Sequence, residues 1–117
     1  MTEDQRYRQV EILQVKVRHH HKLIQSLSEK WKAAERSGRT ARARGFRVTY
    51  EQRLREYLPL LDRLLQAYAA FGASLQAAGD DVTRIGLRQC VLVHHEQRQE
   101  TERTLHELSE PTPALAS

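Results

Sequence analysis

Five arginines lie close together in the middle of the chain, and their chemistry is the easiest in the sequence to interpret. They fall within twelve residues that contain no Asp or Glu: Arg36, Arg39, Arg42, Arg44 and Arg47. The planar guanidinium group forms paired hydrogen bonds to phosphate, and Phe46 beside them could stack on a nucleotide base. The segment is therefore a candidate nucleic-acid or phosphate contact. The alternative is that these arginines pair with acids of this protein or of another subunit.

Two groups of histidines could bind a metal ion only if different helices brought them together. His19, His20 and His21 are adjacent in sequence, as are His94 and His95. Adjacent residues on a helix point about 100° apart, so neither group converges on one ion by itself. His20 and His94 are the pair whose spacing places them toward a shared core. A helical-bundle metal protein using these two is a weaker alternative, and we expect no cofactor because spaced motifs such as HExxH are absent.

The single cysteine and the remaining polar residues form no recognisable catalytic group. Cys90 lies next to apolar residues and far from any predicted helix N-terminus, so we expect a small buried thiol. No glycine-rich phosphate loop follows a strand, and no serine or pair of carboxylates stands in a context that would position it for catalysis. The sequence therefore predicts a protein that is not an enzyme.

The longest apolar pattern spans residues 54–78 and predicts the central helix of the fold. Its apolar side chains recur at alternating steps of three and four: Leu54, Tyr57, Leu61, Leu64, Tyr68, Phe71, Leu75 and Ala78. Leu58, Leu60 and Leu65 widen this stripe beyond what one partner helix in a coiled coil can cover. We therefore expect this helix to pack against more than one neighbour.

A second apolar seam, over residues 10–34, predicts the first helix. Its members are Val10, Leu13, Val17, His20, Ile24, Leu27, Trp31 and Ala34. Ser37-Gly38 predicts its end, since glycine readily adopts the left-handed conformation that closes a helix. Residues 39–48 are then expected to connect the two seams.

The boundaries of the second helix are predicted from local signals. Thr49 and Gln52 resemble a capping box, which places the start of this helix near Tyr50. Pro59 is expected to kink the helix, because proline lacks the N–H that bonds to the preceding turn. The alternative is a break near Leu58, which would give four helices in place of three.

A third helix is predicted over residues 82–109. Gly79 should end the preceding helix, and Asp80 or Asp81 should cap the new one. The middle of this helix has almost no apolar side chains, so we expect it to be exposed or to meet a polar surface. The tail, residues 111–117, is expected to be disordered because it contains two prolines, Pro111 and Pro113, and its apolar residues show no helical period.

Length and composition favour one all-α domain. The chain has 117 residues, only 6% of them aromatic, with 5 glycines and 3 prolines. This composition is typical of helices, and the length suffices for one core. The prediction is a single domain, residues 1–110, folded as an antiparallel three-helix bundle with a coiled-coil-like hairpin.

Charge and hydropathy bear on partners and location. The formal net charge is +4, but residues 36–55 carry +6 and residues 56–117 carry −4. The N-terminal residues lack the apolar core of a signal peptide, and no run approaches the roughly 20 apolar residues that span a bilayer. Together with the lone cysteine, these features predict a cytoplasmic protein without a membrane partner.

The leading functional hypothesis is a non-enzymatic helical interaction module, such as an adaptor, a chaperone-like protein or a scaffold subunit. The wide apolar stripe predicts that it forms homo-oligomers or binds a protein partner. The predicted interface residues are Leu58, Leu61, Leu65, Tyr68 and Phe71. The alternative is a nucleic-acid-binding accessory protein that uses the arginine-rich segment, residues 36–47.

Overall fold

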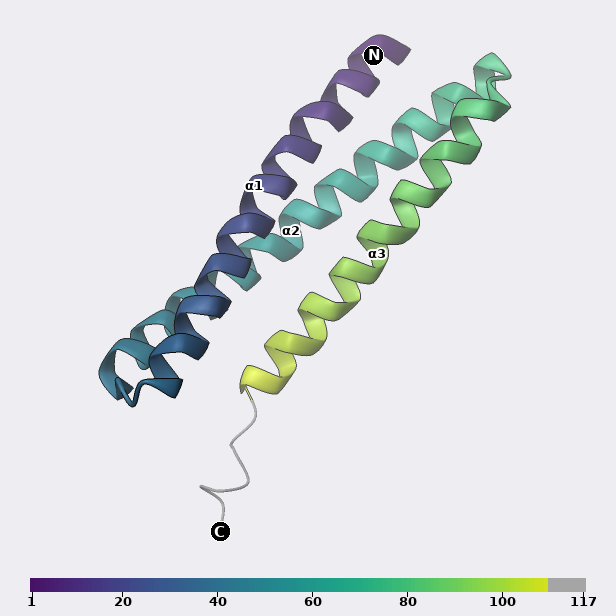
Figure 1. The fold of residues 1–117 in the computed structure, drawn as a ribbon. Helices are drawn as coiled ribbons and strands as arrows, with labels where there is room; N and C mark the ends of the chain where they lie inside the picture. The colour runs from purple at the N-terminus through teal and green to yellow at the C-terminus, as the bar shows by residue number, and fades with distance from the viewer. Residues whose placement is uncertain (110–117) are drawn as a thin grey trace.

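The computed structural model describes residues 1–109 and contains three helices in up-down-up order (Figure 1). The helices are α1 (Glu3–Arg36), α2 (Thr40–Ala78) and α3 (Asp81–Ser109). No strand occurs among these residues, so the predicted all-α three-helix bundle is confirmed. The predicted disordered tail, residues 111–117, lies outside the described part of the chain.

Both ends of α1 are fixed by local interactions. The Thr2 hydroxyl accepts a hydrogen bond from the backbone N–H of Gln5, and the Gln5 side chain accepts one from the backbone N–H of Thr2. This reciprocal capping box satisfies two donors that would otherwise lack partners at the helix start. After α1 ends, Gly38 has a φ of +70°, which glycine adopts without steric cost. The predicted stop at Ser37-Gly38 is confirmed.

The second helix begins at Thr40, not near Tyr50 as predicted. Residues 40–48 are therefore the first turns of α2 and do not form a connector. Thr49 forms no capping box, because its hydroxyl donates to the carbonyl of Gly45 one turn earlier. The alanines and arginines of this segment are good helix formers, and Ala43 is buried, so continued helix is favoured over a start at Thr49.

Pro59 lies inside α2, and the helix continues through it. The alternative with four helices is therefore wrong. Because Pro59 has no N–H, the carbonyl of Arg55, one turn earlier, loses its usual hydrogen-bond donor. Both residues lie on the exposed side of the helix. Water can hydrogen bond to that carbonyl, so the proline does not have to divide the helix.

The turn between α2 and α3 matches the sequence prediction. Gly79 closes α2 with a φ of +75°. Asp80 then accepts hydrogen bonds from the hydroxyl of Thr83 at 2.7 Å and from its backbone N–H at 3.1 Å. The hydroxyl bond and then the backbone bond lower the pKa of Asp80 below its usual value. The first turn of α3 is thus capped by a carboxylate, as predicted.

The central helix α2 is the element on which the other two pack. No Cα atom of α1 comes within 8 Å of one in α3, whereas both helices pack along α2. The buried residues of α2 are Ala43, Leu54, Tyr57, Leu61, Leu64, Ala67, Tyr68, Phe71 and Leu75. From α1 the core includes Val10, Leu13, Val17 and Ile24, and from α3 it is covered by Leu87, Val91, Leu105 and Leu108.

Two glycine substitutions test these helix boundaries. Gly45 lies within α2 with open space around an added Cβ, so Gly45→Ala should raise the free energy of unfolding by about 0.5–1 kcal/mol. Gly79 has a positive φ, so Gly79→Ala should lower it by about 1–2 kcal/mol. Urea unfolding followed by circular dichroism measures both changes. A destabilising Gly45→Ala would contradict the early start of α2.

Candidate functional site

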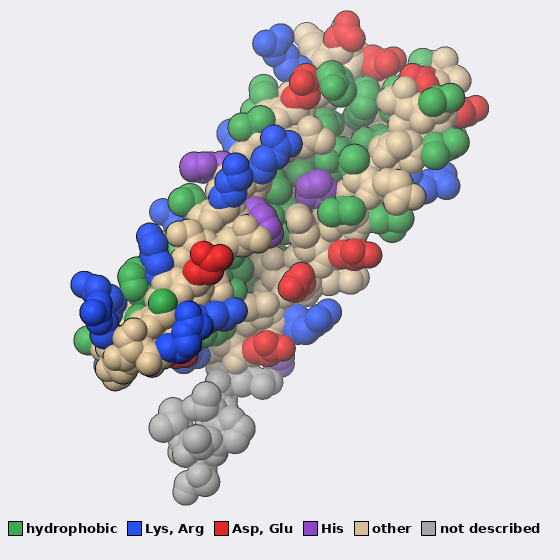
Figure 2. Space-filling view, viewed as in Figure 1, with side chains coloured by type: hydrophobic (Ala, Val, Ile, Leu, Met, Phe, Trp, Pro, Cys, Tyr) green, Lys and Arg blue, Asp and Glu red, His purple; other side chains and the backbone are tan. Residues whose placement is uncertain are grey.

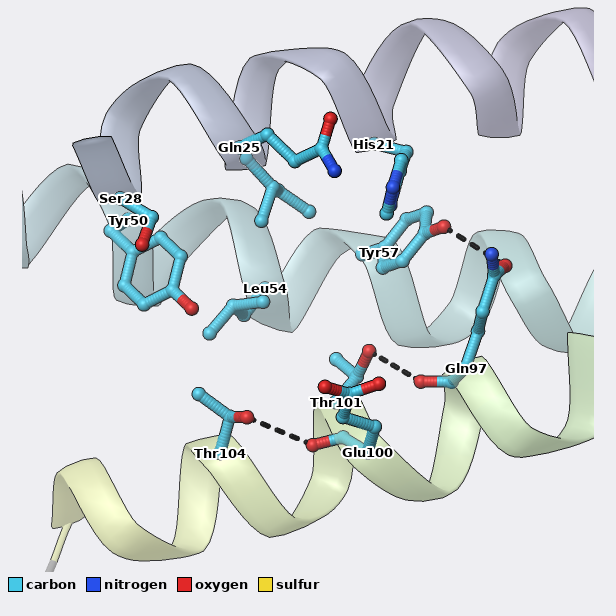
Figure 3. A pocket seen from close by; sticks show the side chains of 11 residues that line it. His21, Gln25, Ser28, Tyr50, Leu54, Tyr57, Gln97, Glu100, Thr101 and Thr104 are labelled. Carbon is cyan, nitrogen blue, oxygen red and sulfur yellow. Dashed lines mark hydrogen bonds between the residues drawn. The ribbon is translucent and has the colours of Figure 1, made fainter. Parts of the chain in front are cut away.

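The helices α1 and α3 face each other across an open groove whose floor is α2 (Figure 3). The groove has a volume of about 220 Å³ and is lined by all three helices. Leu54 and Tyr57 form its floor, with His21 on the α1 side and Gln97 and Thr101 on the α3 side. Its lining combines polar groups, such as those of Gln97 and Thr101, with apolar surface from Leu54 and the Tyr57 ring, so the lining alone does not select a polar ligand.

Tyr57 connects the three helices at this groove. Its side chain is 2% exposed, and its ring stacks on that of His20 with centroids 5.5 Å apart and planes 4° from parallel. Its hydroxyl donates a hydrogen bond to the Gln97 side-chain oxygen at 3.4 Å. Burial raises the pKa of Tyr57 to about 12. The residue therefore remains a neutral hydrogen-bond donor across the physiological pH range.

Tyr68 makes a second connection of the same kind. Its hydroxyl accepts a hydrogen bond from the Gln14 amide nitrogen at 2.9 Å, and its ring lies 5.4 Å from that of His94. Burial raises the pKa of Tyr68, and the hydrogen bond from Gln14 partly opposes this. Each of these two tyrosines thus contacts α1 and α3 at once, although the two outer helices do not pack together.

The structure does not bring His20 and His94 together. His20 contacts Tyr57 and His94 contacts Tyr68, and eleven residues of α2, or about 16 Å, separate the two tyrosines. One ring nitrogen of each histidine is also within hydrogen-bond distance of a backbone carbonyl, that of Arg53 for His20 and that of residue 90 for His94. Within residues 1–109, no three His, Cys, Asp or Glu residues are placed to bind one metal ion.

Cys90 is exposed, so the prediction of a buried thiol is wrong. The neighbouring Val91 packs against the core, and Cys90 points about 100° away from it around the helix. Its apolar neighbours in sequence therefore gave no information about its burial. A helical residue is buried by its angular position and not by the polarity of the next residue.

The polar middle of α3 packs against α2 through polar contacts. Arg98 donates hydrogen bonds to Asp62 of α2 and to Glu102 one turn later. The bond to Asp62 raises the pKa of Arg98, and the smaller effect of Glu102 acts in the same direction. Thr101 is 6% exposed, and its hydroxyl donates to the carbonyl of Gln97 at 2.7 Å. These residues continue the inward-facing stripe of α3, a signal that the sequence carries in their spacing.

The predicted interface residues are mostly inside the folded chain. Leu61, Tyr68 and Phe71 are 0%, 1% and 6% exposed, so a partner cannot reach them in this structure. Leu58 and Leu65 are half-buried, and Leu65 packs against the core. Seam positions of α2 point toward α1 and α3, which already cover them.

Two stripes of exposed apolar side chains lie on the outer helices instead. On α1 the stripe contains Ile12, Val15 and Leu23, and on α3 it contains Val82, Ile85, Leu92 and Val93. Ile85 is 63% exposed and Val15 is 61% exposed, so both side chains lie largely in solvent. Sequence reasoning missed both stripes because it concentrated on the seams, although the helical spacing of these residues is visible in the sequence.

The five predicted arginines have two different environments. Arg47 donates a hydrogen bond to the carbonyl of Leu108 at 3.0 Å, and its guanidinium lies 5.7 Å from the centre of the Trp31 ring. The other four are exposed and form no ion pair with any residue of the described range: Arg36, Arg39, Arg42 and Arg44. Figure 2 shows Lys and Arg side chains gathered at the α1–α2 turn.

Comparison of the chain with family models, curated proteins and solved structures gives no match. None of the helices described above has a stretch long and apolar enough to cross a membrane. Two surfaces of this structure remain unused by the fold, the exposed apolar stripes and the arginines at the α1–α2 turn.

The raised pKa of Tyr57 predicts a loss of stability at alkaline pH. Between its usual pKa of 10.0 and the folded value of about 12, the unfolded chain releases the tyrosine proton and the folded chain keeps it. Stability that is fully present below pH 10 is thus lost as the pH rises, by about 1 kcal/mol at pH 11. Urea unfolding at pH 8 and pH 11 measures this loss.

In Tyr57→Phe this pH-dependent loss should be smaller, because the ionising hydroxyl is absent. Tyr7, which is 49% exposed, provides the control. Tyr7→Phe should lose as much stability between the two pH values as the wild type. Equal behaviour of the two variants would show that Tyr57 is not the group responsible.

Proposed function

We propose that this protein is a non-enzymatic helical interaction module, an adaptor, chaperone-like or scaffold subunit that associates with further copies of itself. The observation that carries this proposal is the pair of exposed apolar stripes on α1 and α3. Exposed apolar side chains at helical spacing favour association, because packing against another helix removes them from water. We also propose a cytoplasmic location, which suits the exposed thiol of Cys90 because thiols stay reduced there.

The two stripes are suited to each other in spacing. Ile12, Val15 and Leu23 are separated by three and then eight residues, and Val82, Ile85 and Val93 repeat these separations. Each stripe therefore extends over about 16 Å of helix on a face turned away from α2, with polar residues such as His19 and Gln89 between its apolar ends. The α1 stripe of one copy can pack along the α3 stripe of another with matching positions.

Charge favours the same pairing. Arg8 and Lys16 lie one turn before and one turn after Ile12, on the face that carries the α1 stripe. Glu96 and Glu100 continue the α3 stripe beyond Val93 and are exposed. An α1 face with positive charge and an α3 face with negative charge attract each other, whereas two α1 faces would repel.

Light scattering coupled to size-exclusion chromatography tests this proposal. The wild-type protein should have a mass above that of one chain, and Ile85→Lys should lower it, because a buried lysine in the contact lacks a partner. Val48→Lys is the control, since Val48 is 60% exposed on α2 outside both stripes. It should leave the mass unchanged. A wild-type mass of one chain at all concentrations would contradict self-association.

A nucleic-acid-binding accessory role is the second candidate. It is favoured by the four exposed arginines at the α1–α2 turn, which have no acidic partner in the described residues. Unpaired guanidinium groups keep their hydrogen-bond donors available for phosphate oxygens. Elsewhere, Arg53, Arg55 and Arg98 pair with carboxylates, whereas exposed arginines such as Arg18, Arg63 and Arg103 form no ion pair with the described residues either. The α1–α2 turn differs from these sites because four unpaired arginines lie within nine residues there.

The salt dependence of binding tests the second candidate. Each phosphate contact releases counterions, so the slope of log affinity against log salt is roughly −0.7 to −0.9 per contact. Replacing Arg39, Arg42 and Arg44 with Ala should therefore flatten the slope by about 2. A control variant of equal charge replaces three exposed arginines elsewhere: Arg18, Arg63 and Arg103. An equal effect of both variants would show that the turn is not the contact.

A further inference from the structure

One side of the α1–α2 turn is a hollow that holds three cations and an aromatic ring. Lys30 of α1 and Arg39, Arg42 and Phe46 at the start of α2 line it, together with the small side chains of the last turns of α1. Its volume is about 290 Å³, and no carboxylate is among the lining residues. A concave surface with three cations and no acid attracts an anionic ligand more strongly than a flat surface of the same charge.

The cations of this hollow are available to a ligand. Lys30, Arg39 and Arg42 are exposed and form no ion pair with the described residues. The first turn of α2 contains no acidic residue, and Arg39 forms no side-chain cap there. The positive end of the helix dipole therefore adds to the charge of the three side chains.

Phe46 distinguishes this hollow from a simple phosphate site. Its ring is half-buried, lies outside the core cluster and borders the hollow. An accessible aromatic ring next to cations is the arrangement that binds unpaired bases, because each base offers a flat face for stacking. In a duplex these faces are covered by neighbouring base pairs, so the ring favours a single strand.

The other side of the turn is organised differently. There Arg47 is held by Trp31 and the Leu108 carbonyl, and the Trp31 indole donates to the Glu35 carboxylate at 2.8 Å. Arg44 lies on this side, together with Glu35. On this side Arg44 therefore lies near Glu35, and Arg47 helps to hold the end of α3. The aromatic ring here, Trp31, already contacts Arg47 and Glu35.

We propose that the hollow formed by Lys30, Arg39, Arg42 and Phe46 binds single-stranded nucleic acid. The three cations contact consecutive phosphates, and one base stacks on Phe46. This inference rests on the second candidate function and deepens it, because it assigns the contact to one side of the turn and selects single strands over duplexes.

Fluorescence anisotropy with labelled single-stranded DNA and RNA of about 12 nucleotides tests the proposal on the full chain. The double variant Arg39→Ala/Arg42→Ala should weaken binding tenfold or more. The matched variant Arg36→Ala/Arg44→Ala removes the same charge outside the hollow and should change affinity less than about threefold. All four side chains are exposed, so both variants keep the fold.

The aromatic contact is tested at Phe46. Phe46→Leu should weaken binding by roughly tenfold through loss of stacking, and Phe46→Tyr should retain it. A duplex of the same length should bind more weakly than either single strand, and inorganic polyphosphate should compete poorly. Preference for RNA or for DNA identifies the natural strand, and either supports the proposal.

Four results would overturn the inference. Equal weakening by the two double-arginine variants, or no effect of Phe46→Leu, would reject this hollow and leave the second candidate standing. Polyphosphate that competes as well as an oligonucleotide would show a general polyanion site. Absence of binding to any nucleic acid would reject both this inference and the second candidate, without affecting self-association through the apolar stripes.

Discussion

Burial of the apolar seam of α2 is the interaction on which the rest of the structure depends. Leu61 and Leu64 are 0% exposed and Leu75 is 1% exposed. Removing such side chains from water contributes about 1.5–3 kcal/mol each, and a single neighbouring helix covers only part of a helix surface. The central helix therefore needs one helix on each side, which explains why α1 and α3 pack along it without packing against each other.

The two tyrosines in the α2 seam explain how α3, whose middle is largely polar, can pack against the core. Tyr57 and Tyr68 bury their rings among apolar residues and direct their hydroxyls to Gln97 and Gln14. A buried polar group is stable only when it has a hydrogen-bond partner, and these contacts supply one. The pairing of Arg98 with Asp62 adds a partly exposed contact between α2 and α3, where ion pairs contribute little because water screens them. The polar residues of α3 thus fix its register on α2 more than they stabilise it.

Side chains of the same type differ in whether they take part in contacts within the folded chain. Arg47 holds the end of α3 near Trp31 and belongs to the structure, whereas Arg39 and Arg42 face solvent with their donors free. The apolar residues divide in the same way. The leucines of the α2 seam are buried in the core, whereas other apolar side chains on α1 and α3 are exposed. The exposed apolar side chains and the unpaired arginines are the groups from which a partner would gain binding energy, because the folded chain does not already use them.

The sequence by itself determined the three helices, the glycine stops at Gly38 and Gly79 and the cap at Asp80, because these depend on side-chain spacing and on contacts within one turn. It failed at Thr49, where a local capping pattern competed with a longer helix, and at Cys90, whose burial depends on its angle around α3. Only the tertiary structure decided which groups are used and which remain free. Phe71 is buried, and Arg47 donates a hydrogen bond to the carbonyl of Leu108, 61 residues further along the chain. Both contacts depend on how the helices pack together, which no local sequence pattern shows.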